Sequence, residues 1–142
     1  EHVKRAVEIR DNFIDSKGNK SQTLIFGNGD VTDLEDAERK VKETGCDGVL
    51  LGRAISGNPW CFSRTVNRED VSIPDRLRVM VEHTKLFEEL LPHKSFAIMK
   101  KHYKAYVNGW DGAKELRLKL METKTAGEVA EIVEEYLKTH TT

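Results

Sequence analysis

The sequence is poor in the residues on which several classes of protein depend. Two cysteines in 142 residues, Cys46 and Cys61, are too few for a disulfide scaffold. They form neither a CxxC pair nor a His/Cys cluster, so we expect two reduced thiols and no metal site. No apolar run reaches the 18 residues that a membrane-spanning helix needs, and no signal peptide is visible at the start. We therefore expect a cytoplasmic protein without a membrane segment.

Neither sign of charge dominates the chain. The 23 Lys and Arg residues against 24 Asp and Glu give a formal net charge of −1, which excludes a globally basic nucleic-acid-binding protein but not a local basic face. Hydrophobic residues make up 38% and are grouped, which is enough for a modest core. Because the chain begins with Glu1 rather than Met, we expect it to be a piece of a longer protein.

The first half of the sequence predicts a βαβ unit behind an amphipathic helix over 2–13. Two short unbroken apolar runs, at 23–26 and 49–51, predict strands that are buried on both faces, as in a parallel sheet. Between them we expect a helix over 33–44, opened by a capping box of Thr32 with Glu35 and closed by Gly45. A further short helix is expected at Asn58-Pro59-Trp60.

The second half of the sequence predicts a small four-helix bundle. Pro92 and Asn108-Gly109 break the helical pattern, and Thr125 with Glu128 forms a second capping box. The connections are short, as in a bundle. The expected helices cover 75–91, 94–107, 113–121 and 126–139. We therefore predict two domains, an α/β part over 1–66 and a helical part over 74–142.

Glycine-bearing turns follow both predicted strands. Gly27-Asn28-Gly29-Asp30 follows the first strand and Gly52-Arg53 the second, and ligands bind at the carboxyl ends of parallel strands. Glycine lets an anion approach the backbone, and Arg53 suits phosphate oxygens. Asn28 and Asp30 could hydrogen-bond a sugar-like hydroxyl. Either turn alone is better explained as a plain loop, but the pair favours a phosphate site. In (β/α)₈ barrels such sites commonly follow strands seven and eight, which suggests the last quarter of a barrel.

Specific motifs occur in both halves of the sequence. In the helical half these are Met99-Lys100-Lys101-His102 with Tyr106, and Glu115-Leu116-Arg117. In the α/β half they are Ile25-Phe26-Gly27-Asn28-Gly29-Asp30-Val31, Glu43-Thr44-Gly45-Cys46-Asp47-Gly48-Val49, Gly52-Arg53-Ala54 and Gly57-Asn58-Pro59-Trp60. Together and in this order, these motifs resemble the C-terminal part of bacterial tRNA-dihydrouridine synthases.

The resemblance implies an oxidoreductase that reduces uridine in the tRNA D-loop to 5,6-dihydrouridine, using FMN that NADPH reduces. By this resemblance, Asn28, Gly29 and Asp30 match flavin-contacting positions after strand seven of a TIM barrel, and Gly52 and Arg53 match the phosphate-contacting pair after strand eight. The family's catalytic cysteine belongs to an earlier barrel strand, and neither cysteine of this chain matches it. We therefore expect no catalytic residue here and no reductase activity from the chain by itself.

The resemblance also implies an RNA-binding surface in the helical half. Between Lys94 and Lys119 there are seven Lys or Arg residues and two acidic ones. Composition alone favours a solvated helix surface, and the resemblance reverses that preference. Two departures from the family pattern are Lys100, where arginine is common, and Ala105, where tryptophan is usual. The residues expected to bind RNA are Lys100, Lys101, His102, Lys104 and Arg117.

Two other functions remain open on the sequence. The helical half could be a free-standing RNA-binding module whose α/β segment is only a scaffold. Alternatively, the chain could belong to another phosphate-binding barrel enzyme with a helical tail. In every case two strands cannot close a barrel, so we expect exposed apolar surface and self-association of the chain.

Overall fold

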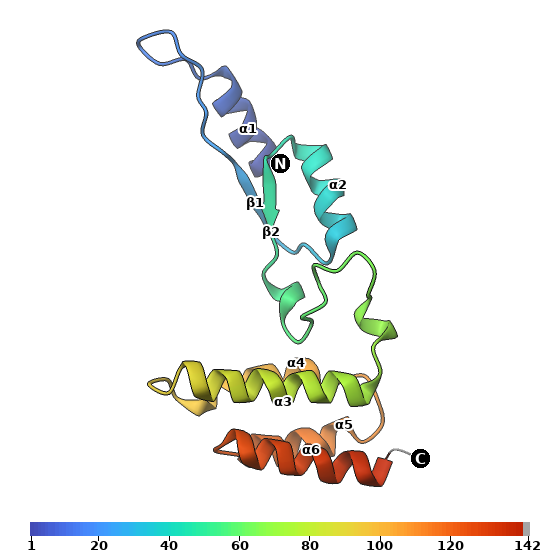
Figure 1. Cartoon of the computed structure of the whole chain (residues 1–142). Coiled ribbons are helices and arrows are strands. Elements are labelled where there is room, and N and C mark those ends of the chain that lie inside the picture. Colours follow the sequence, from blue (N-terminus) through green and yellow to red (C-terminus); the bar gives the residue numbers. More distant parts are fainter. Residues whose placement is uncertain (141–142) are drawn as a thin grey trace. The chain divides into compact units, whose positions relative to one another are not determined.

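The computed structural model describes residues 1–140, which form two compact units (Figure 1). The first unit contains residues 1–55 and 60–64. The second contains residues 56–59 and the chain from Thr65 onward. The short segment 56–59 therefore belongs to the helical unit, although it follows directly on the α/β part in the sequence.

The first unit is a βαβ unit preceded by a helix. Its elements in chain order are α1 (His2–Asn12), β1 (Phe26–Asn28), α2 (Leu34–Thr44), β2 (Gly48–Leu50) and the 3₁₀ turn η1 (Arg53–Ile55). The two strands pair in parallel, with Phe26 opposite Gly48 and Asn28 opposite Leu50. This pairing confirms the predicted strand–helix–strand unit and brings both strand ends to one edge.

The N-terminal cap of helix α2 lies one residue later than predicted. The side chain of Asp33, not Thr32, accepts a hydrogen bond from the backbone N–H of Asp36 at 2.7 Å. The predicted capping box is therefore wrong, because an adjacent carboxylate takes the cap position and Thr32 instead donates its hydroxyl to Asp33 at 2.9 Å. The predicted end is confirmed, since Gly45 has a left-handed φ of 72° and bonds back to the Val41 carbonyl at 2.8 Å.

One face of the strand pair is open. A Cβ on the buried Gly27 would lie 3.6 Å from a methyl carbon of Val3, so α1 covers that face. On the opposite face, Leu24 is 63% exposed and Phe26 and Leu50 are 53% exposed. The prediction that these runs are buried on both faces is therefore wrong for this chain, because the described residues supply no third strand or helix to cover the second face.

The helix predicted at Asn58-Pro59-Trp60 is a single turn, closed by a 2.8 Å bond from Ser63 N–H to the Trp60 carbonyl. The expected cap does not form, because Oδ1 of Asn58 is buried without a hydrogen-bond partner among the described residues.

The second unit consists of four helices around one apolar core. They are α3 (Ile73–Leu90), α4 (Met99–Tyr106), α5 (Ala113–Glu122) and α6 (Ala126–His140), with 3₁₀ turns η2 (Arg68–Asp70) and η3 (Phe96–Ile98). Helix α3 packs against α4 and α6, and α5 packs against the same two helices. The side chains with no exposed surface are those of Leu77, Met80, Thr84, Met99, Tyr103, Val107, Leu120 and Val129.

The helix ends of the second unit agree with the sequence except at α4. Helix α4 starts five residues after the predicted Lys94, because Lys94 closes a turn on the Leu91 carbonyl at 2.9 Å. The capping interaction at α6 forms, since the Thr125 hydroxyl accepts from Glu128 N–H at 3.2 Å. The Glu128 carboxylate accepts from Lys124 N–H at 2.7 Å and so extends the cap by one residue. Residues 141 and 142 of the predicted helical domain lie outside the described chain.

Candidate cofactor and nucleic-acid sites

The turn after β1 has an unusual backbone conformation. Gly29 has a φ of 143° and Asp30 a φ of 46°. Among the described residues, Asp30 is the one residue other than glycine that has a positive φ. A left-handed aspartate is disfavoured unless its surroundings hold it in place. The turn is therefore shaped by contacts from outside β1.

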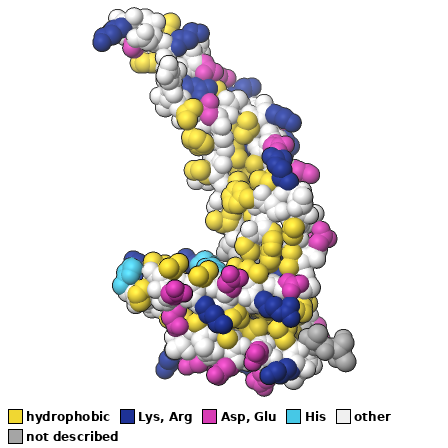
Figure 2. Space-filling model, in the orientation of Figure 1, with side chains coloured by type: hydrophobic (Ala, Val, Ile, Leu, Met, Phe, Trp, Pro, Cys, Tyr) yellow, Lys and Arg dark blue, Asp and Glu magenta, His cyan; other side chains and the backbone are white. Residues whose placement is uncertain are grey.

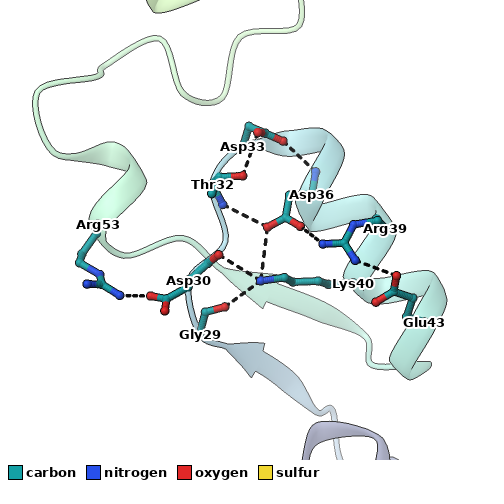
Figure 3. A network of polar contacts seen from close by, with 9 residues as sticks. All are labelled: Gly29, Asp30, Thr32, Asp33, Asp36, Arg39, Lys40, Glu43 and Arg53. Carbon is teal, nitrogen blue, oxygen red and sulfur yellow. Dashed lines mark hydrogen bonds and ion pairs between the residues drawn. The ribbon is translucent and has the colours of Figure 1, made fainter. Parts of the chain in front are cut away.

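Lys40 of α2 supplies those contacts (Figure 3). Its Nζ donates to the Gly29 carbonyl at 2.9 Å and to the Asp30 carbonyl at 3.0 Å. It also pairs with the Asp36 carboxylate at 3.3 Å, and that carboxylate accepts from Thr32 N–H at 3.2 Å. The sequence analysis missed Lys40, because its role depends on how α2 packs beside the strand end and no local pattern marks it.

The two strand ends meet through an ion pair. The Arg53 guanidinium, which follows β2, binds the Asp30 carboxylate, which follows β1 (Figure 3). The two side chains are 87% and 76% exposed, and exposed pairs of this kind contribute little free energy. Arg53 is thus held close to Asp30 but free to exchange that carboxylate for another anion.

The backbone beside this ion pair is accessible. A Cβ built on Gly29 or on Gly52 would meet no atom within 4 Å, and the Asn28 side chain is exposed. The five residues predicted to contact a cofactor therefore lie together around the ends of β1 and β2. They offer open backbone, one guanidinium and hydrogen-bonding side chains, which is a donor set that fits a phosphate with an attached polyol.

Neither cysteine presents a thiol at this edge. Cys46 is buried, and its Sγ donates to the Gly48 carbonyl at 3.1 Å. Cys61 is also buried, and burial together with the negative charge of Asp33 raises the pKa of its thiol. Among residues 1–140 no group of three or more His, Cys, Asp or Glu side chains has a metal-binding arrangement.

Cationic side chains extend from α4 and the following helix. Lys101 and Lys104 are exposed and Lys100 is partly exposed, and no carboxylate of the described chain lies within salt-bridge distance of any of the three. Arg117 of α5 is partly buried and donates to the Val107 carbonyl at 2.8 Å, so it also holds the end of α4. Figure 2 shows Lys and Arg side chains interspersed with Asp and Glu on the visible face of the helical unit, with histidines toward its left end.

His102 packs against a second histidine that the sequence analysis left without a role. Its ring centroid lies 5.0 Å from that of His83 on α3, edge to face. His83 Nδ1 lies 3.3 Å from the Tyr106 hydroxyl. Burial lowers the pKa of both imidazoles, and the charges of His83 and Lys101 lower the pKa of His102 further. No sequence pattern reveals this pair, because its members are 19 positions apart on different helices.

Comparison with known proteins gives a consistent result. The family model described as dihydrouridine synthase matches residues 13–141. A probable tRNA-dihydrouridine synthase of Aquifex aeolicus is 30% identical over 114 residues, which cover 78% of this chain and 36% of that protein. One from Staphylococcus aureus is 34% identical over 118 residues, covering 80% and 35%. The probable tRNA-dihydrouridine synthase 2 of Bacillus subtilis is 31% identical over 119 residues, with the same coverage.

The matched region includes both strands with their paired ends and all four helices of the helical unit, but not helix α1. The chain belongs to the dihydrouridine synthase family. It spans about a third of the length of the curated relatives that it matches. In the described part of the chain, no helix has the length and apolar character needed to cross a membrane.

Proposed function

We propose that this chain is the C-terminal portion of a cytoplasmic tRNA-dihydrouridine synthase, an oxidoreductase that reduces uridine in the tRNA D-loop. In this proposal the strand pair is the end of a TIM barrel and the four helices form the tRNA-binding domain. The observation that carries it is the extent of the family match, because residues 13–141 include both the Asp30–Arg53 strand-end pair and the basic helix α4.

FMN is the cofactor that the strand ends fit. When bound, FMN supplies a hydride for the uracil ring after NADPH has reduced it. Arg53 would hold the phosphate of FMN together with the open backbone at Gly52, exchanging its exposed bond to Asp30 for charge-assisted bonds to phosphate oxygens. Asn28, Gly29 and Asp30 would orient the polyol from the other strand end, and Lys40 would keep their turn in its binding conformation.

The helical unit is the part of the chain that we propose for tRNA. The ammonium groups of Lys100, Lys101 and Lys104 are free of carboxylate partners in the described chain, which leaves them available to backbone phosphates. Arg117 would add a contact while it keeps the end of α4 fixed. His102 lies on the same helix and would add a further contact to the RNA.

The proton donor of the reaction is expected elsewhere in the protein. Cys46 and Cys61 are both buried, so neither can reach a uracil ring bound at the strand ends. We therefore propose that the described residues bind cofactor and RNA, and that the chain by itself has no reductase activity.

The two alternatives from the sequence are less well supported. A free-standing RNA-binding module does not account for a family match that extends through the α/β unit from residue 13. Another phosphate-binding barrel enzyme with a helical tail does not account for relatives that carry the name tRNA-dihydrouridine synthase along about 80% of this chain.

Deletion of the gene that encodes the chain tests the proposal directly. Total tRNA from the deletion strain and its parent is digested to nucleosides, and dihydrouridine is measured by mass spectrometry. We expect dihydrouridine to be lost from at least one D-loop position and restored by the full-length gene on a plasmid. Unchanged dihydrouridine at every position of every tRNA would contradict the proposed function.

A further inference from the structure

We propose that His83, His102 and Tyr106 form a contact site for an RNA phosphodiester, and that one imidazole of the site takes up a proton when the RNA binds. This inference rests on the proposed function and adds to it a specific site and a proton. It assigns a role to His83, which lies on α3, outside the basic helix α4.

The geometry of the three side chains supports a shared site. The two imidazole rings are 5.0 Å apart between centroids, and the rings of His83 and Tyr106 are 6.0 Å apart. The Tyr106 hydroxyl lies 3.3 Å from Nδ1 of His83 and so occupies that nitrogen. An anion placed over the pair would meet the remaining nitrogens of both rings.

Those remaining nitrogens are available to solvent. In residues 1–140, neither Nε2 of His83 nor either ring nitrogen of His102 has a hydrogen-bond partner. None of them belongs to the buried polar atoms that lack a partner, which in the described chain are atoms of Asn58, Arg76 and Tyr103. A ring nitrogen that is neither bonded nor fully buried reaches the surface, although each ring is itself about half buried.

The charges around the pair favour an anion. One turn away from His83 on α3 lie Val79, Met80, Leu86 and Phe87, and none of them carries a charge. The corresponding neighbours of His102 on α4 are Ile98, Met99, Ala105 and Tyr106, which are also uncharged. The charged groups that act on His102 are His83 and Lys101. Helix α5 contributes Arg117 at the end of α4, and η3 contributes no charged residue.

Protonation of the pair follows from this setting. In the free protein, burial lowers the pKa of both imidazoles and so favours their neutral form. A bound phosphodiester would raise the pKa of the ring that it touches, because an opposite charge favours the imidazolium. Between the free and the bound pKa, binding therefore takes up one proton. Affinity is highest at acidic pH and falls as the pH rises toward the bound pKa, by at most about tenfold per pH unit for one proton.

The test uses the 142-residue chain and an unmodified tRNA transcript. Titration calorimetry at pH 7 in buffers of different ionisation enthalpy gives the number of protons taken up, and affinity is measured from pH 5.5 to 8. The variants are His83→Asn and His102→Asn. The matched control is His93→Asn, which removes an exposed histidine from the loop between α3 and η3. We expect proton uptake in the wild type and the control, and a loss of uptake and of pH dependence in both site variants.

Nuclear magnetic resonance of the wild-type chain tests the site without variants, so its result does not depend on whether the histidine variants fold. The imidazole resonances of the wild-type chain at pH 7 are expected to move toward the charged form when the transcript is added. Tight binding with no proton uptake would overturn this site and leave the proposed function standing. No binding of tRNA at all would overturn this site and the tRNA-binding role proposed for the helical unit, whereas the proposed activity would still be decided by the deletion strain. The same shift produced by inorganic phosphate at the transcript's concentration would assign the pair to a free anion and overturn the RNA contact.

Discussion

Of the glycines in the described chain, Gly57 has the least space for a side chain, because the backbone of Ala105 lies against it. It has a φ of 67°, and a Cβ there would lie 2.4 Å from the carbonyl carbon and oxygen of Ala105. Arg68 ties the same two segments together, donating from Nε to the Gly57 carbonyl at 3.3 Å and from Nη2 to the Ala105 carbonyl at 3.1 Å. The segment 56–59 is thereby fixed on the last turn of α4.

Gly57→Ala should therefore destabilise the helical unit. Overlap with backbone cannot be relieved by a side-chain rotation, so the cost adds about 1–3 kcal/mol to that of a left-handed alanine. Gly109→Ala is a matched control, because Gly109 has a φ of 88° but a Cβ there would meet nothing within 4 Å. Urea unfolding followed by circular dichroism should give a clearly lower midpoint for Gly57→Ala than for Gly109→Ala. Equal midpoints would show that the segment is not packed as described.

At the scale of elements, the exposed cations of α4 should set the salt dependence of tRNA binding. Replacing Lys100 and Lys101 with glutamine should weaken binding and reduce the slope of log affinity against log salt by about one to two, at about 0.7–0.9 per lost phosphate contact. Lys138→Gln on α6 is a single-charge control, because it removes one positive charge from a different helix, where Lys138 lies 3.8 Å from Glu134. A wild-type slope in the double variant would mean that RNA is held elsewhere.

The elements that the sequence predicts well are those with local signals. The 3.6-residue apolar period and the residues at Gly45 and Thr125 place α2, α3, α5 and α6 to within about two residues, because these signals act within a single helical turn. The start of α4 and the turn at Asn58 were predicted wrongly, because Lys94 bonds to a preceding carbonyl and Asn58 is buried instead of capping.

In the candidate sites, too, the residues with a local sequence signal could be predicted, and those that depend on tertiary packing could not. The strand-end residues could be found from glycine and arginine spacing, because parallel strands bring their carboxyl ends to one edge. Lys40 and His83 could not, because each acts on a residue at least ten positions away through the packing of a helix. The exposure of Phe26 and Leu50 could not be predicted either. An apolar run predicts a strand, but it does not reveal whether further strands are present to cover that strand.

At the scale of the molecule, the open face of the strand pair should make the chain self-associate. Large apolar side chains exposed in the first unit include Ile9, Phe13, Leu24, Phe26, Leu50 and Phe62. Exposed strand edges and contiguous apolar patches pair with other chains. Light scattering should show mass rising with concentration, and Phe26→Lys with Leu50→Lys should reduce the effect. A strictly monomeric chain at every concentration would mean that this face is covered in solution.

The packing of α3 against α6 also has a consequence for folding during synthesis on the ribosome. The buried side chains of α3, among them Leu77 and Met80, pack with Val129 and Val133 of the last helix. About 50 residues separate the two helices' ends, Leu90 and His140, which corresponds to about 3–10 s of translation at 5–20 residues per second. During that interval the first helix of the unit emerges without its principal partner. A nascent chain stalled after α5 should therefore remain open to protease and to chaperones, and release of α6 from the exit tunnel should be the event that closes the core.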